Sequence, residues 1–202
     1  MFGLSWAVLV GAGLGVMGAY GQVSGAVGAI PSQWPEASRL AHAGRSTLLI
    51  FLHPECGCSR ASVGELDRVL AHSSSDVDTH AIFIKPKKWS DEKVRGELWE
   101  QAGAIPGVRL HVDADSHEAK LFGAKTSGHT ILFDPQGRRV FSGGITPSRG
   151  HMGDNVGQLA LVDLLNGLKK EESIATRVFG CGLFGGEFIN RKVLAFFSGA
   201  TP

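Results

Sequence analysis

Apolar and polar positions along this chain follow two periods, one typical of strands and one typical of helices. Short apolar or alternating segments predict strands at 47–52, 79–84, 108–112, 130–133 and 139–142. Apolar residues at helical spacing predict helices at 58–72, 90–102, 115–122 and 155–168, with a shorter one at 36–43. Between the last two strands, Asp134-Pro135-Gln136-Gly137 predicts a hairpin turn.

The order of these elements defines the expected architecture. Strands and helices alternate through the first three units, which is typical of parallel strands, and a hairpin and a final helix then follow. The sequence therefore predicts an α/β fold with a mixed central sheet covered by helices.

The first part of the chain differs from the rest because it carries no charge before Glu36. Phe2–Tyr20 is an apolar run interrupted only by Ser5, and it is about as long as a bilayer-spanning helix. We expect a transmembrane anchor or signal-anchor at 1–22; the alternatives are a signal peptide cleaved near Ala19 or Gly21 and a buried helix.

The segments around the predicted domain differ in composition. Residues 23–36 are rich in glycine, serine and proline and predict a linker. The domain is then expected at 37–170. Residues 171–202 form a tail whose apolar residues predict packing against the domain.

The net charge and the number of cysteines limit the classes of function that this chain can have. The net charge is +1, so no basic surface for nucleic acid is indicated. Three cysteines are too few for a disulfide scaffold but sufficient for a redox pair and one more thiol, or for a small metal site.

Two of the three cysteines lie where the first strand leads into a helix. The apolar run 48–52 stops at His53-Pro54, Cys56 and Cys58 follow, and helical spacing then begins. The positive end of a helix dipole favours a thiolate over a thiol. We therefore take Cys56 as the candidate nucleophile; a buried structural thiol is the alternative.

Two segments carry a resemblance to a known superfamily. FLHPECGCSRASVGEL and TILFDPQGRRVFSGGI resemble the strand–cysteine–helix segment and the late hairpin of thioredoxin-like proteins, and the likeness covers about residues 40–170. The chain most resembles the membrane-tethered bacterial branch, which is related to peroxiredoxin-like proteins. The resemblance implies a thioredoxin-like three-layer sandwich, an exposed Cys56, and thiol–disulfide chemistry on a protein partner in the periplasm. It implies no cofactor.

The motif also departs from that superfamily. The second cysteine of the usual C-x-x-C motif is replaced by Ser59, which leaves an atypical C-x-C-S motif. The segment 126–129 lacks the proline that precedes the late hairpin in the superfamily. Leu49 and His53 occupy the positions of the proline and threonine that peroxiredoxins use, so a peroxidase is disfavoured.

The sequence does not decide which cysteine forms a disulfide with Cys56. A bridge to Cys58 would close a small, strained ring that is easily reduced, which suits a catalyst better than a structural bond. Cys58 facing the core is the alternative. Cys181 is either a resolving thiol or a buried cysteine of the tail.

Several polar residues are expected to support the site. The second hairpin strand returns to the sheet edge that the resemblance assigns to the active site, so the glycine-rich loop 143–155 is placed near it. The alternative is that this loop is only a flexible connection between the hairpin and the last helix, which Asp154 or Asn155 caps. The supporting residues are His53, Pro54, Ser59, Arg60, His129, Arg149 and His151.

Three functions follow from these residues. The first is thiol–disulfide exchange, in which Cys56 attacks and Cys58 or Cys181 resolves the mixed disulfide. The second is a Cu(I)- or Zn-binding assembly factor, because thiolates and imidazoles suit these ions. Its ligands would come from Cys56, Cys58, Cys181, His53 and His129. The third is a non-catalytic binding module.

Overall fold

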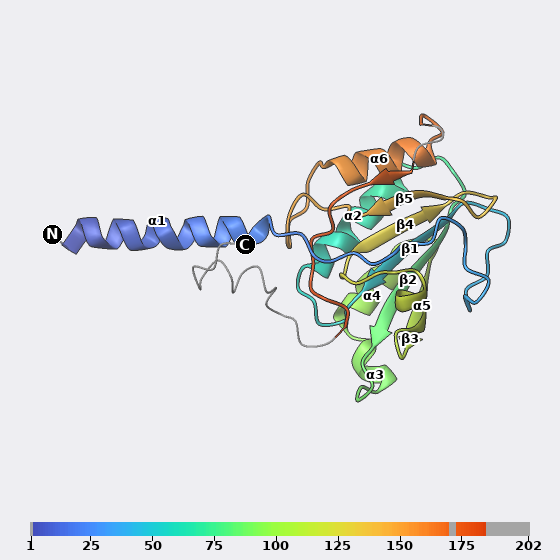
Figure 1. Ribbon diagram of the computed structural model, residues 1–202, viewed down its shortest axis with the longest axis horizontal. Coiled ribbons are helices and arrows are strands. Elements are labelled where there is room, and N and C mark those ends of the chain that lie inside the picture. Colours follow the sequence, from blue (N-terminus) through green and yellow to red (C-terminus); the bar gives the residue numbers. More distant parts are fainter. Residues whose placement is uncertain (1, 170–172, 185–202) are drawn as a thin grey trace.

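The computed structural model describes residues 2–169 and 173–184. Figure 1 shows one α/β domain, with helix α1 (Phe2–Gly21) extending away from it. Residues 185–202 of the predicted tail lie outside the described part of the chain.

A six-stranded mixed sheet forms the centre of the domain, in the order β3-β2-β1-β4-β5-β6. Strands β1, β2 and β3 are parallel, β4 is antiparallel to both β1 and β5, and β6 is parallel to β5. The predicted mixed sheet is therefore confirmed. The strands are β1 (Thr47–Leu52), β2 (Asp78–Lys85), β3 (Val108–Ala114), β4 (His129–Phe133), β5 (Arg139–Gly143) and β6 (Ile174–Ala175).

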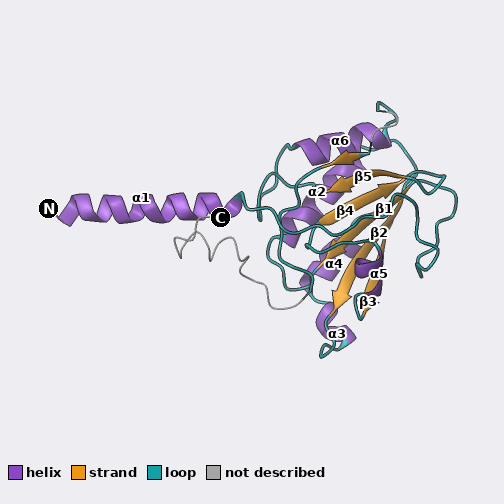
Figure 2. Cartoon of the chain, viewed as in Figure 1, coloured by secondary structure: helices purple, strands orange, loops and turns teal. Residues whose placement is uncertain are grey.

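Helices lie on both faces of this sheet (Figure 2). They are α2 (Ser59–Ala71), α3 (Asp91–Val94), α4 (Glu97–Gly103), α5 (His117–Leu121) and α6 (Val156–Leu165). Alternate residues of β1 point to opposite faces. Leu48, Ile50 and Leu52 join the core beneath α2, α4 and α6, while Leu49 and Phe51 join the core beneath α5. The result is a three-layer sandwich, because β1 is buried from both sides.

The predicted helix at 90–102 is divided in two. Gly96 is extended and precedes α4, so α3 ends at Val94 after a single turn. Ser90 caps α3 by accepting a hydrogen bond from the Lys93 backbone N–H, as the sequence start signal indicated. Glycine between two helical segments favours such a break because it stabilises a helix poorly.

The predicted helix at 36–43 is wrong, because this segment forms turns instead. The Ser38 hydroxyl and the Arg39 backbone N–H both donate to the Glu118 carboxylate, at 2.7 and 3.0 Å. The Ser38 oxygen also accepts from the Leu40 backbone N–H at 3.1 Å. Such local bonds compete with helical ones, and the contact with α5 decides the outcome.

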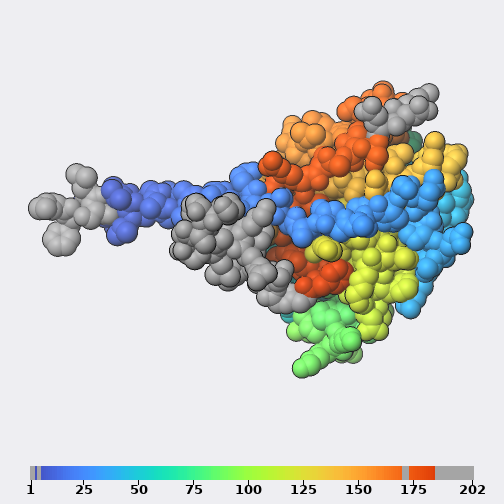
Figure 3. Space-filling model, viewed as in Figure 1, coloured from blue at the N-terminus to red at the C-terminus, as the bar shows by residue number. Residues whose placement is uncertain are grey.

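The segment predicted as a linker lies against the domain. In the space-filling view of Figure 3, its blue atoms run across the surface of the domain. The Gly28 N–H donates to the Gly123 carbonyl at 2.9 Å, and the Arg139 guanidinium donates to the Ile30 carbonyl at 2.7 Å. The Trp34 ring contacts Phe122 and Phe133 edge-on, with centroids 5.1 and 5.2 Å apart. This segment therefore contributes to the core.

The uncharged helix predicted near the N-terminus does form, as α1. Its apolar side chains are exposed, among them Trp6, Leu9 and Met17. Within the described residues, no helix reaches the length and apolarity needed to cross a bilayer. The membrane anchor thus stays a prediction.

The packing of Trp34 predicts a measurable loss of stability. Trp34→Ala removes two edge-on aromatic contacts from a half-buried ring, and we expect a loss of about 2 kcal/mol in the free energy of unfolding. Trp6→Ala is the matched control; its ring is 69% exposed, so a change below about 0.5 kcal/mol is expected. Denaturant unfolding measures both. Equal effects would show that the 23–36 segment does not stabilise the domain.

Candidate thiol site

A tight turn connects β1 to α2 and carries two of the cysteines. The Cys56 N–H donates to the His53 carbonyl at 3.0 Å, and the Ser59 N–H donates to the Cys56 carbonyl at 2.9 Å. Cys58 is the residue that caps α2, and its side chain makes no capping hydrogen bond. The thiols therefore lie at the positive end of a helix of several turns.

Cys56 is buried, with 3% of its surface exposed, whereas Cys58 is half-buried. The prediction of an exposed Cys56 is therefore wrong. The reason lies in the tail. Cys181 sits close to Cys56, so the tail covers a thiol that the turn alone would leave open.

The tail is held by antiparallel backbone pairing with the segment before β4. The Ser127 N–H donates to the Cys181 carbonyl, and the Leu183 N–H donates to the Lys125 carbonyl, both at 2.8 Å. Thr126 and Gly182 form an antiparallel bridge between these bonds. Leu183 is buried in the core beneath α5. The position of Cys181 is thus fixed on both sides.

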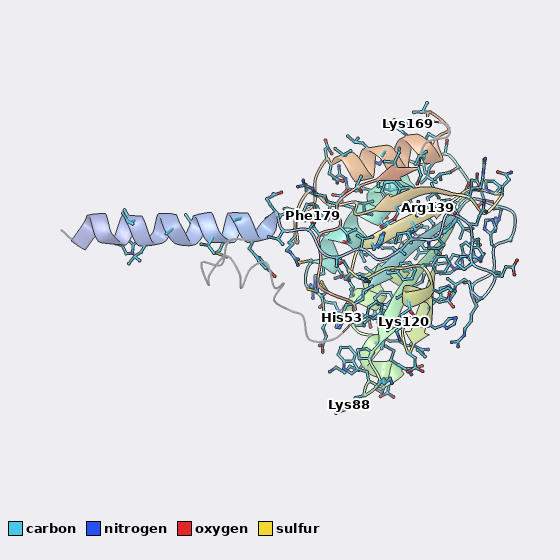
Figure 4. The ribbon with its side chains drawn as sticks, viewed as in Figure 1. His53, Lys88, Lys120, Arg139, Lys169 and Phe179 are labelled. Atoms are coloured by element: carbon cyan, nitrogen blue, oxygen red, sulfur yellow. The ribbon has the colours of Figure 1, made fainter. Side chains whose placement is uncertain are left out.

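This pairing brings the three cysteines together. The sulfur atoms of Cys56, Cys58 and Cys181 all lie within 4.8 Å of one another. All three are free thiols in this structure. Figure 4 shows His53 and Phe179, which mark the two segments that meet here, on the side of the domain from which α1 projects.

The pKa values of the three thiols are shifted in different directions. Hydrogen bonds from Cys181 and then Cys58 lower the pKa of Cys56 far below that of an ordinary thiol, although burial acts in the opposite direction. The same bond raises the pKa of Cys181, because its proton is held against the Cys56 sulfur. For Cys58, the bond with Cys181 lowers the pKa, but the bond with Cys56 and burial outweigh it. The cluster therefore holds its negative charge on Cys56.

Arg149 binds backbone carbonyl groups of both the tail and the segment that follows α1. Its guanidinium donates to the Gly180 carbonyl at 2.6 Å and to the Val23 carbonyl at 3.0 Å. Its backbone N–H donates to the Gly21 carbonyl at 3.0 Å. Its positive charge also favours a thiolate at Cys58. The structure thus places Arg149 near the cysteines, where it binds backbone carbonyls.

Two serine hydroxyls also lie close to the cysteines. The hydroxyls of Ser59 and Ser127 lie 2.6 Å apart, and the His53 N–H donates to the Ser127 oxygen at 2.7 Å. Ser59 also acts on Cys56 and lowers its pKa. Sequence reasoning missed Ser127, although its segment had been singled out for lacking a proline.

His53 and Pro54 lie in the turn between β1 and Cys56. Burial lowers the pKa of His53, and the nearby charge of Cys56 acts in the opposite direction. The His53 ring also meets Trp89 edge-on, with centroids 5.8 Å apart.

Three other predicted residues lie elsewhere or make separate contacts. Arg60 is exposed and pairs with Glu97 of α4. His129 is buried within the sheet, where its Nε2 lies 2.9 Å from the Ser142 hydroxyl, and burial lowers its pKa to about 4. His151 is exposed, and its Nδ1 lies 2.8 Å from the Arg149 carbonyl.

Two alternatives from the sequence are settled by these positions. Asn155 caps α6, since its side chain accepts from the Gln158 N–H at 3.0 Å, so the end of the 143–155 loop has a structural role. In the described residues, the cluster with metal-ligand geometry contains the three cysteines and neither His53 nor His129.

No protein-family model matches the chain, and no curated protein matches it either. Several solved structures do match the chain. A hypothetical protein of Sinorhizobium meliloti is 19% identical with a TM-score of 0.57, covering 80% of this chain and 93% of its own. An uncharacterised protein of Geobacillus kaustophilus is 18% identical with a TM-score of 0.54, covering 83% and 94%.

A putative protein disulfide isomerase of Bacteroides thetaiotaomicron is 17% identical with a TM-score of 0.50, covering 70% of this chain and 92% of its own. The fold is thioredoxin-like. At these identities the likeness concerns the thioredoxin-like fold alone, so the activity has to be argued from the cysteines.

The different pKa shifts predict that the alkylation rates of the three thiols depend differently on pH. The Cys56 pKa is lowered, so Cys56 stays a thiolate as the pH falls from about 8 to 6, and its alkylation rate should change little. The pKa values of Cys58 and Cys181 are raised, so their rates should fall about tenfold per pH unit. Mass spectrometry of protein pulsed with a small alkylating reagent measures each rate.

Two variants serve as controls for this profile. Cys181→Ala removes the strongest hydrogen bond to Cys56, so the pH profile of Cys56 should move upward. Cys58→Ala removes the weaker bond and should move it less. A wild-type Cys56 rate that falls as steeply as the other two would contradict the assignment of the thiolate.

Proposed function

We propose that the protein is a thiol–disulfide oxidoreductase acting on a protein partner, with Cys56 as the nucleophile. One observation carries the proposal. A cysteine that two neighbouring thiols hold as a thiolate follows β1 of a thioredoxin-like fold, and both of those thiols are close enough to resolve a mixed disulfide.

The reaction has two exchange steps. The Cys56 thiolate attacks one sulfur of a partner disulfide, which forms a mixed disulfide and releases the other partner sulfur as a thiolate. A second cysteine of the cluster then gives its proton to the partner thiolate already released, and its sulfur attacks the Cys56 sulfur and releases the remaining partner thiolate. Two thiols of the protein become one disulfide, and one partner disulfide becomes two thiols. The reverse sequence oxidises a dithiol.

Cys181 is the better resolving thiol of the two candidates. Its hydrogen bond is the strongest influence on the Cys56 thiolate, and the two sulfurs lie within 4.8 Å of each other. A bridge between Cys56 and Cys58 would span a single residue and strain the preferred torsion of a disulfide. The tail also governs access, because Cys56 is 3% exposed and a partner sulfur reaches it only when the tail moves aside.

The location remains part of the proposal. We propose an oxidising compartment such as the periplasm, where disulfides persist, with α1 holding the domain at a membrane. The support is the absence of charge before Glu36 and the exposed apolar side chains of α1. The full chain should stay with membranes after a carbonate wash, and a chain starting at Gln22 should be soluble. Release of the full chain into the supernatant would refute the membrane role.

The resolving step predicts a trapped partner. In cells producing the full chain, Cys181→Ser should accumulate a mixed disulfide at Cys56, because the thiolate that completes the exchange is missing. Cys58→Ser is the matched control and should accumulate no mixed disulfide, because Cys181 remains to resolve it. Non-reducing electrophoresis and mass spectrometry identify the cross-linked species.

The double variant Cys56→Ser/Cys181→Ser tests the nucleophile. It should trap nothing, because no thiolate starts the exchange. A mixed disulfide that persists in this variant would assign the attack to Cys58. If neither single variant traps a partner, the proposed exchange with proteins is wrong.

A further inference from the structure

We propose that Cys56, Cys58 and Cys181 also form a binding site for one Cu(I) ion, in which each cysteine supplies one thiolate sulfur. Exchange chemistry uses two thiols at a time. This structure gathers three, from a turn and from a tail far away in sequence, with all sulfurs within 4.8 Å of one another. A third thiol within this range is not consumed by the exchange reaction.

The sulfur separation suits a metal ion. A thiolate binds a metal such as zinc at about 2.3 Å, so three sulfurs in a plane around one ion lie about 4.0 Å apart. The present upper limit is 4.8 Å, so the sulfurs need to approach one another by about 0.8 Å at most. Changes in side-chain torsion alone supply such movements.

The set of ligands favours Cu(I) over Zn. Thiolate is a soft ligand that suits both ions, but zinc in structural sites takes four ligands in a tetrahedron. The described cluster offers three sulfurs and no imidazole or carboxylate. Three soft ligands match the low coordination numbers of Cu(I). The site is also partly dry, since Cys56 is buried and the other two cysteines are half-buried.

Charge is balanced by the neighbourhood. Three thiolates around a monovalent cation carry an excess of negative charge. The Arg149 guanidinium acts on Cys58 through its charge and bonds the Gly180 carbonyl beside Cys181. The N-terminus of α2 adds a partial positive charge beside Cys58.

The third ligand depends on how the tail is seated. Gly180 packs so closely that a Cβ atom there would lie 2.0 Å from the Ser127 carbonyl oxygen, which belongs to the backbone. A side chain at this position must therefore push the tail away from the segment before β4. Gly180→Ala would displace Cys181 while leaving all three cysteines in the chain.

The test is a competition for copper. The full-length protein, reduced and kept without oxygen, is titrated with Cu(I) in the presence of bathocuproine disulfonate. We expect one Cu(I) per chain and an X-ray absorption spectrum with three sulfur neighbours. Cys58→Ser, Cys181→Ser and Gly180→Ala should each weaken binding at least about tenfold, since even outer-shell partners of a metal act on this scale.

Gly96→Ala is the control for glycine substitution, because no atom lies within 4 Å of an added Cβ there. It should bind Cu(I) like the wild type. Circular dichroism checks that each variant is folded; if Gly180→Ala is not, the two cysteine variants decide alone. Failure to withdraw copper from the chelator, or wild-type affinity in Cys58→Ser or Cys181→Ser, would overturn the proposal.

The copper site and the exchange reaction can fail separately. Copper binding needs reduced protein and three sulfurs, whereas the proposed exchange needs Cys56 and Cys181. Cys58→Ser separates them, because it should weaken copper binding while Cys181 still resolves the mixed disulfide, so that no partner is trapped. A protein that binds copper but traps no partner would retain the metal site and lose the proposed enzyme.

Discussion

The antiparallel pairing between residues 181–183 and 125–127 is the interaction on which the site depends. Two backbone hydrogen bonds of 2.8 Å place Cys181 against Cys56 and turn a two-thiol motif into a three-thiol cluster. The same pairing buries Cys56 and supplies the strongest hydrogen bond to its sulfur. Reactivity, access and the third ligand therefore all follow from one short piece of paired backbone.

Burial and charge oppose each other at Cys56. A buried thiolate is costly, because desolvation raises the pKa of a thiol. Donors outweigh that cost: two thiols and the Ser59 hydroxyl all point toward the sulfur. Because these donors are themselves thiols, the groups that stabilise the anion are also the ones that can exchange with it or share a metal. Stabilisation and chemistry thus come from the same atoms.

The central sheet could be predicted from the sequence, and the cover over Cys56 could not. Strand β1 is a continuous apolar run that leads into Cys56, so local pattern suffices for that part of the site. Strand β6 has two residues, too few to show a period. The tail pairs through its backbone, which leaves no mark in side-chain pattern. The failed helix at 36–43 has the same kind of cause, because distant Glu118 binds that segment.

Arg149 joins the two ends of the described chain at one point. Its backbone and guanidinium bind the carbonyls of Gly21 and Val23, where α1 gives way to the segment along the domain, and the guanidinium also binds Gly180 beside Cys181. Its guanidinium also lies over the ring of Tyr20 in α1, 5.0 Å from the centroid. The segment after α1 and the tail that covers Cys56 are therefore held together here, since the Gly25 N–H also donates to the Val178 carbonyl at 2.8 Å.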